Sequence, residues 1–323
     1  MLIERLSKQT GLDRGRLRYF AESASRRYYV FSVPKATGGY RKIAHPARPL
    51  KAVQRWLNAK YFIRLPIHDA ATAYRKGRGL KANAQPHLAK RFTLRIDFRE
   101  FFPNFTMLHI YKFLELNSDL LEMAGDDALV ATMLVCRDGG LTIGAPTSPV
   151  LTNAMMFEFD QMLTEYCIGK RIVYTRYADD LFLSTNEPNI LGQTLDFVRS
   201  LAESYQFARL RVNSKKTAFL SKKYHREITG LVITPDGEVS IGRKKKRELK
   251  ALVHKLITGD LPKDRVAYLE GYLNFVRDVE PSFIVSLKAK YGEFMWAFQN
   301  FSGATVHTSF SRLEGLDGDE ETD

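Results

Sequence analysis

Alternation of apolar and polar residues divides the chain into segments of different kinds. The spacing in residues 1–27 is helical, and residues 30–46 have the pattern of two short strands around a Gly-Gly turn. A helix is expected to begin near Pro49 and to bury one apolar face. The N-terminal part of the chain is therefore predicted to be a small unit of helices and strands.

Two later segments alternate like strands and carry acids. Within residues 92–97 the apolar side chains share one face, so Asp97 ends the strand on the opposite face. Residues 171–185 predict a hairpin whose tip, residues 178–180, holds two adjacent aspartates. If the two segments are neighbours in one sheet, their carboxylates lie close together.

Helical patterns dominate the remainder. A rigid loop at residues 144–149 leads into a helix, with Ser148 expected as the N-cap and Pro149 as the first helical residue. Beyond residue 240 the spacing is helical, with a basic run at 243–247 and two amphipathic segments after it. The pattern predicts an α+β protein with a small helical bundle near its C-terminal end.

Composition narrows the class of protein. Of the 323 residues, 45% are hydrophobic and 26% charged, as in soluble globular proteins, and no apolar run is long enough to span a bilayer. The first residues lack the apolar stretch of a secretory signal, so we expect a cytoplasmic protein without membrane contact. Cys136 and Cys167 lack the spacing of a zinc site and are interpreted as small core residues.

Positive charge is concentrated at one end of the chain. Residues 1–91 hold 21 Lys and Arg against 4 Asp and Glu, whereas the remaining residues hold 28 against 32. Because cations bind phosphates and aromatic rings stack on bases, this aromatic-rich segment favours a nucleic-acid partner over a merely solvated basic face. The last residues, 312–323, are predicted to be a disordered acidic tail.

The aspartates at the strand ends need a chemical reason. Burying a carboxylate beside apolar residues is costly unless a positive group compensates it. Mg²⁺ prefers carboxylate oxygens, and two such ions roughly 3.5–4 Å apart activate an attacking hydroxyl and stabilise a leaving phosphate oxygen. An Asp-Asp pair is also common at hairpin tips because Asp favours turns, so the pair by itself leaves both interpretations open.

Four motifs, in order, resemble the conserved boxes of reverse transcriptases. Residues 177–180 read YADD, and the strand ending at Asp97 is followed by FFP at 101–103. GAPTSP at 144–149 lies between these boxes, and VNSKKT at 212–217 follows them. The resemblance implies an α+β right-handed polymerase with fingers, a palm of antiparallel sheet and helices, and a helical thumb.

Further elements are similar to those of bacterial retron enzymes. NAQPH at 83–87 resembles the NAxxH element, and ITG at 228–230 resembles the VTG triplet, with similarity of arrangement over residues 1–310. The implied domains are fingers at 1–91, completed together with the palm by 111–147; palm at 92–110 and 148–240; and thumb at 241–311.

The resemblance assigns roles to individual residues. Phe102 is the steric gate against a ribose 2′-hydroxyl, with a core phenylalanine as the alternative. Arg41 and Lys42 hold the triphosphate, unless they belong to a solvated strand face. Lys216 neutralises or protonates the leaving pyrophosphate, with plain phosphate binding or helix capping as the alternative. The catalytic and metal-binding acids, for two Mg²⁺ ions, are Asp97, Asp179 and Asp180.

RNA recognition is assigned to elements outside the polymerase boxes. Asn83 and His87 are interpreted as a specificity surface for the enzyme's own RNA, with an ordinary surface histidine as the alternative for His87. The basic run is interpreted as a binding site for an RNA backbone on the thumb, with a solvated helix face as the alternative. Its members are Arg243, Lys244, Lys245, Lys246 and Arg247.

A retron-type enzyme is expected to copy a cognate structured noncoding RNA (msr-msd) into single-stranded DNA, primed from a guanosine 2′-hydroxyl and left joined to the RNA as msDNA. The expected partners are this RNA, its DNA product and an effector or toxin protein, in anti-phage defence. The alternatives are an intron-type or defence-associated reverse transcriptase that uses an ordinary primer, and a nucleic-acid-binding scaffold. One departure is Ile143, where the family usually has a glutamine beside the incoming nucleotide.

Overall fold

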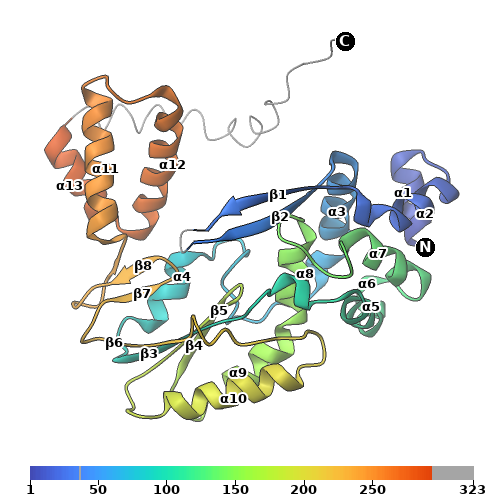
Figure 1. The fold of residues 1–323 in the computed structure, drawn as a ribbon, viewed down its shortest axis with the longest axis horizontal. Coiled ribbons are helices and arrows are strands. Elements are labelled where there is room, and N and C mark those ends of the chain that lie inside the picture. The colour runs from blue at the N-terminus through green and yellow to red at the C-terminus, as the bar shows by residue number, and fades with distance from the viewer. Residues whose placement is uncertain (36–37, 293–323) are drawn as a thin grey trace. The chain divides into compact units, whose positions relative to one another are not determined.

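The computed structural model describes residues 1–35 and 38–292 (Figure 1). Contacts within the chain form two compact units, the first being Met1–Thr229 and the second beginning at Gly230. The division into fingers, palm and thumb is finer than these units and stays a prediction. The expected acidic tail at 312–323 lies outside the described residues, as does the end of the expected thumb segment 241–311.

A four-stranded antiparallel sheet forms the centre of the first unit. Its strand order is β4-β5-β3-β6, so the two predicted acid-bearing segments are direct neighbours. Leu94 and Ile96 are buried as predicted, and Thr93 on the opposite face is buried too, so the strand is covered on both faces. The strands are β3 (Phe92–Asp97), β4 (Val173–Tyr177), β5 (Asp180–Thr185) and β6 (Ala218–Ser221).

The predicted hairpin is formed by β4 and β5, with a tighter turn than expected. Only Ala178 and Asp179 lie between the strands, because Asp180 already pairs with Tyr177. The expected tip of three residues was therefore one residue too long. Ala178 has a φ of 56°, in the left-handed region where hairpin turns usually place glycine.

The N-terminal segment forms two helices because Gly11 interrupts it with a left-handed φ of 73°. Asp13 then caps the second helix, its side chain accepting a hydrogen bond from the Arg16 amide. The predicted strand pair and the helix after it are present. These elements are α1 (Leu2–Thr10), α2 (Arg14–Glu22), η1 (Ala24–Arg26), β1 (Tyr28–Pro34), β2 (Tyr40–Pro46) and α3 (Arg48–Lys60).

Helices pack around the sheet; α9 and α10 lie beneath it in the view of Figure 1. α8 begins at Thr147, one residue before the expected N-cap, so Ser148 lies inside the helix and its hydroxyl accepts from the Thr142 amide at 3.3 Å. The expected N-cap was therefore wrong. The remaining helices of this unit are η2 (Phe62–Arg64), α4 (Leu80–Ala84), η3 (Gln85–His87), η4 (Phe102–Asn104), α5 (Met107–Leu116), α6 (Ser118–Leu121), α7 (Asp126–Val135), α8 (Thr147–Met155), α9 (Phe157–Ile168) and α10 (Leu191–Ser204).

Over residues 230–292, which the structure describes, the second unit is mainly a bundle of three helices, which lie side by side in Figure 1. The predicted apolar faces are buried, through Leu269 and Leu273 on one helix and Phe283 and Leu287 on the next. Within the described residues, no helix combines the length and apolar character needed to cross a bilayer. The elements are β8 (Leu231–Ile233), β9 (Val239–Ser240), α11 (Gly242–Ile257), α12 (Lys263–Val279) and α13 (Pro281–Tyr291), after β7 (Arg226–Ile228) at the end of the first unit.

Candidate active site

The three predicted acids converge at one edge of the sheet. Asp97, the last residue of β3, is directly opposite Asp180, the first residue of β5. Asp179 lies in the adjoining turn, where its carbonyl oxygen accepts a hydrogen bond from the Phe98 amide at 3.1 Å. Asp97 is buried, and Asp179 and Asp180 are partly exposed. Strand pairing thus gathers carboxylates from positions more than eighty residues apart in the sequence.

Positive side chains partly neutralise this cluster. Nζ of Lys216 lies 2.7 Å from Oδ2 of Asp97, and the Asn213 side-chain amide donates to Oδ1 of Asp97 at 2.8 Å. Arg95 donates twice to Oδ1 of Asp180, at 3.0 and 2.9 Å. Lys216 was predicted as a nucleotide contact, whereas sequence reasoning missed Arg95 and Asn213. Asn213 lies inside the quoted VNSKKT segment, so a signal for it was present.

The electrostatics favour an added cation. Burial, together with the neighbouring Asp180 carboxylate, raises the pKa of Asp179 to about 6. Burial also raises the pKa of Asp180, although Arg95 opposes that shift. A raised carboxyl pKa means that the negative form is disfavoured in its surroundings, and a bound divalent cation reverses this preference.

The donor set fits Mg²⁺ that is shared with a substrate. In the part of the chain that the structure describes, no three His, Cys, Asp or Glu side chains form a ready-made ligand group. Mg²⁺ commonly binds one or two carboxylates and completes its shell with substrate phosphates and water, so Asp97 and Asp179 provide suitable ligands.

Phe102 is partly buried, whereas Arg41 and Lys42 are exposed. Phe102 begins η4 and is partly buried, with its ring 5.6 Å from that of Phe101 in an edge-on contact. Arg41 and Lys42 are exposed on β2, opposite Val33 and Ser32. Packing against Phe101 therefore restrains the Phe102 ring. The exposed side chains of Arg41 and Lys42 are accessible to a ligand.

Tyr74 is a neighbour of the site that sequence reasoning missed. Burial and the Asp179 carboxylate raise the pKa of its hydroxyl, while the Arg41 guanidinium lowers it. Tyr74 has a φ of 58°, unusual for a residue other than glycine. Arg41 on β2 and Asp179 in the β4–β5 turn therefore both act electrostatically on the Tyr74 hydroxyl.

Ile143 and Gly144, in the loop before α8, contact strand β2. The Ala44 amide on β2 donates to the Ile143 carbonyl oxygen at 2.8 Å. Gly144 has a φ of 111°, and a Cβ atom there would lie 2.7 Å from the Ala44 carbonyl oxygen. The close approach of the two backbones therefore requires glycine at this position.

The structure corrects the interpretation of Asn83 and His87 as an RNA-recognition surface. Both side chains have no exposed area. The His87 ring contacts the hydroxyls of Ser184 and Thr175, each at 2.8 Å. The Asn83 amide oxygen accepts from Thr72, and its nitrogen lies 3.5 Å from the Thr229 hydroxyl. Because both side chains are buried and hydrogen-bonded inside the first unit, where the His87 ring connects β4 and β5, neither is available to contact RNA directly.

The basic run on α11 divides into two groups. Arg243, Lys244 and Arg247 are exposed. Lys245 pairs with Glu248 at 2.8 Å, and Lys246 pairs with Glu280 of the α12–α13 connection. The two paired lysines therefore stabilise the helical bundle, and the three exposed residues are the better candidates for phosphate contacts.

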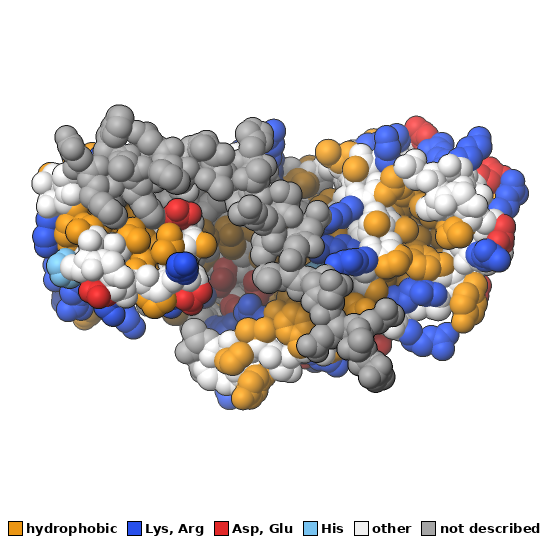
Figure 2. All heavy atoms as spheres, turned by 90° about the horizontal axis from the view of Figure 1, so that it is seen from above, with side chains coloured by type: hydrophobic (Ala, Val, Ile, Leu, Met, Phe, Trp, Pro, Cys, Tyr) orange, Lys and Arg blue, Asp and Glu red, His pale blue; other side chains and the backbone are white. Residues whose placement is uncertain are grey.

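The N-terminal part presents a mixed basic and apolar surface. Figure 2 shows Lys and Arg side chains interspersed with hydrophobic ones over the right-hand part of the view, where the N-terminal elements lie in Figure 1. Tyr19, Tyr29 and Tyr40 are more than half exposed. Some of the arginines are paired, as Arg18 is with Asp126 at 2.7 Å. The tyrosines of the predicted nucleic-acid surface are thus exposed, but ion pairs leave fewer of its arginines available to bind phosphates than the composition indicates.

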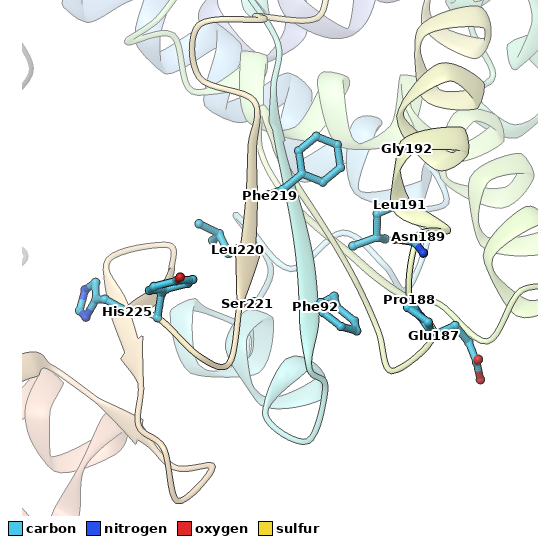
Figure 3. Close-up of a pocket in the computed structure, with 11 residues that line it drawn as sticks. Phe92, Glu187, Pro188, Asn189, Leu191, Gly192, Phe219, Leu220, Ser221 and His225 are labelled. Atoms are coloured by element: carbon cyan, nitrogen blue, oxygen red, sulfur yellow. The ribbon is translucent and has the colours of Figure 1, made fainter.

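A groove of about 690 Å³ in the first unit (Figure 3) has none of the three acids in its lining. It is lined by Phe92, the first residue of β3, whereas Asp97 is the last residue of that strand. Cys136 and Cys167 are buried, as predicted, and burial raises the pKa of each thiol to about 12. Neither feature supplies a group to the acid cluster.

Comparison with known proteins agrees with the motifs and the geometry. Residues 33–254 match the family described as reverse transcriptase (RNA-dependent DNA polymerase). The retron Ec83 reverse transcriptase of Escherichia coli is 34% identical over 282 residues, covering 82% of this chain and 87% of that protein. The retron Ec86 reverse transcriptase of Escherichia coli is 30% identical over 300 residues, covering 89% and 90%. The chain therefore belongs to the reverse transcriptase family, among the retron enzymes, and is an RNA-directed DNA polymerase.

Proposed function

We propose that this polymerase uses two Mg²⁺ ions, with Asp97 and Asp179 as their main ligands. The observation that carries the proposal is the pairing of Asp97 with Asp180 across β3 and β5, with Asp179 in the adjoining turn. When bound, such ions activate the attacking hydroxyl and stabilise the leaving phosphate oxygen. Asp180 has a supporting role, because Arg95 already donates two hydrogen bonds to one of its carboxylate oxygens and makes that oxygen less available to a metal ion.

The surrounding side chains orient the nucleotide and select it. Arg41 and Lys42 bind the triphosphate, supported by their exposure on β2 and by the effects of both Arg41 and Asp179 on the pKa of the Tyr74 hydroxyl. Lys216 leaves Asp97 to neutralise or protonate the departing pyrophosphate, a transfer that its half-exposed position permits. Phe102 excludes the ribose 2′-hydroxyl, supported by the packing of its ring against Phe101.

The Asp179→Asn variant tests the metal assignment. Because it removes one ligand charge without changing the basic surfaces, primer extension with Mg²⁺ should fall by at least about 100-fold, while the affinity for an annealed primer and template is retained. Asp196→Asn, at an exposed position on α10, is the matched control and should extend normally. Near-full synthesis by Asp179→Asn would contradict the assignment.

On the likeness to retron enzymes, we extend the proposal to the substrate. The enzyme copies a cognate structured noncoding RNA, starts from a guanosine 2′-hydroxyl of that RNA and leaves the single-stranded DNA joined to it as msDNA. The exposed cations of the first unit and of α11 are suited to such a polyanion. The proposal implies two further partners, the DNA product and an effector protein acting in cytoplasmic anti-phage defence.

The covalent link between RNA and DNA tests the priming step. In cells that produce the protein and the RNA encoded beside it, we expect a short DNA whose gel mobility shifts after RNase treatment. It should shift again after a 2′,5′-debranching enzyme, because only a 2′-primed product carries that bond. Cells with Asp179→Asn should lack the product. A DNA that is insensitive to debranching favours an ordinary primer and leaves the polymerase assignment intact.

A further inference from the structure

A buried pair of opposite charges contacts the Ala178-Asp179 turn between β4 and β5. Arg176 on β4 and Asp160 on α9 both have side chains without exposed area. Nε and Nη2 of Arg176 donate to the two carboxylate oxygens of Asp160, at 2.8 and 2.7 Å. The Tyr174 hydroxyl donates to the same carboxylate at 2.7 Å. Such a pair is weak evidence for stability, because both charges lose their hydration on burial, so its presence here calls for another reason.

The third nitrogen of the guanidinium connects this pair to the turn. Nη1 of Arg176 lies 3.2 Å from the Ala178 carbonyl oxygen, to which it donates. The carbonyl oxygen of Asp179 accepts from the Phe98 amide at 3.1 Å. The carbonyl oxygens of both turn residues therefore accept hydrogen bonds, that of Ala178 from the Arg176 side chain and that of Asp179 from the Phe98 amide.

The turn needs such support. Ala178 has a φ of 56°, and an L-residue in the left-handed region persists only where its surroundings determine the conformation. It is also buried, and in a buried turn a carbonyl group needs a donor from the protein. Without that donor, the backbone before Asp179 has an unsatisfied carbonyl and a strained φ together.

The same arginine fixes the segment that leads to Tyr74. Its backbone amide donates to the Ala70 carbonyl at 2.7 Å, and its own carbonyl accepts from the Thr72 amide at 2.8 Å. Nη1 also donates to the Asn153 side chain, which in turn donates to the Ala73 carbonyl at 2.9 Å. Arg176 thus connects residues 70–73 with the Ala178-Asp179 turn.

We propose that Arg176 is a positioning residue of the polymerase: locked by Asp160, its guanidinium holds the Ala178-Asp179 turn so that the Asp179 carboxylate is placed beside Asp97. The inference rests on the proposed metal role of Asp179. It assigns the buried pair to the geometry of the metal ligands, in addition to any contribution to stability.

Two variants separate positioning from simple stability. Arg176→Lys keeps a positive charge beside Asp160, but a single ammonium lacks the planar fork that serves Asp160 and Ala178 together. The double variant Arg176→Gln with Asp160→Asn removes both charges, so neither is left buried without its partner. Tyr174→Phe is the matched control, because it loses a hydrogen bond to Asp160 and leaves the donor to the turn in place.

The measurement is extension of an annealed primer by the full chain over a range of Mg²⁺ concentrations, at temperatures below thermal unfolding. We expect the Mg²⁺ concentration for half-maximal rate to rise about 10-fold or more in Arg176→Lys and in the double variant. In Tyr174→Phe it should stay within about 2-fold of the parent, even if the unfolding temperature falls.

A folded Arg176→Lys or double variant with the parent's Mg²⁺ dependence would overturn the proposal and leave the pair a structural one. If Arg176→Lys fails to fold, the double variant alone decides. An equal Mg²⁺ shift in Tyr174→Phe would also overturn it, because general loosening of the core would then explain the effect. Asp179→Asn measured in parallel separates the two hypotheses, since its retained activity would contradict the metal role whatever Arg176 does.

Discussion

At the scale of the residue, His87 shows how burial changes the chemistry of a side chain. Burial lowers the pKa of His87 to about 3, and the nearby Arg226 and Lys90 charges act in the same direction. The folded protein therefore keeps this ring neutral at pH values where the unfolded chain, with a pKa near 6.5, takes up a proton. Its contribution to stability is present above about pH 6.5 and is lost as the pH falls toward 3.

Urea unfolding of the parent and of His87→Gln at pH 7.5 and 5.0 measures this contribution. We expect the variant to be less stable at pH 7.5, because it loses contacts with Ser184 and Thr175. Between the two pH values the parent should lose about 2 kcal/mol more than the variant, from a slope near 1.4 kcal/mol per pH unit. An identical pH dependence would mean that position 87 accepts a proton in the folded state.

At the scale of the element, the position of strand β2 depends on its contact with the loop before α8. Gly144→Ala should displace β2, because the new Cβ atom would lie only 2.7 Å from the Ala44 carbonyl oxygen. The alanine would also have to adopt a φ of 111°, which is strained for an L-residue. Since Arg41 and Lys42 belong to that strand, the KM for deoxynucleotides should rise by about 10-fold or more, as expected when positioning groups move by about 1 Å.

Gly139→Ala is the matched control for that experiment. Gly139 also has a positive φ, 87°, yet nothing lies within 4 Å of a Cβ atom there. The control should therefore show only the backbone strain of an L-residue, about 1–2 kcal/mol in thermal or urea unfolding, with an unchanged KM. Equal changes of KM in both variants would show that the contact between Gly144 and Ala44 does not position the strand.

At the scale of the whole molecule, the number of exposed cations sets the salt dependence of RNA binding. On α11, replacing Arg243, Lys244 and Arg247 with Gln should make the slope of log affinity against log salt shallower by about 2–3, because each phosphate contact contributes nearly one counterion. The double change of Lys245 and Lys246 to Gln should alter the slope less and lower stability more, since both lysines are ion-paired. Equal slopes for the two variants would refute the division of the run.

The sequence by itself determined the family, the strand-borne acids and the order of the main elements. Strand alternation placed Asp97 at a strand end, and the YADD box placed the other acids in a hairpin, because these features depend on local spacing and on residue types that the chemistry requires. The helical faces of α12 and α13 followed from periodicity for the same reason.

The tertiary structure alone decided which polar residues are buried and what they bind. Asn83 and His87 have the residue types of a recognition surface, yet their contacts with Thr72, Ser184 and Thr175 come from distant segments that bury them. The role inferred for Arg176 likewise depends on Asp160, on a different element. Burial and pairing are properties of the folded chain, because they arise where separate elements meet, and local sequence patterns do not encode those meetings.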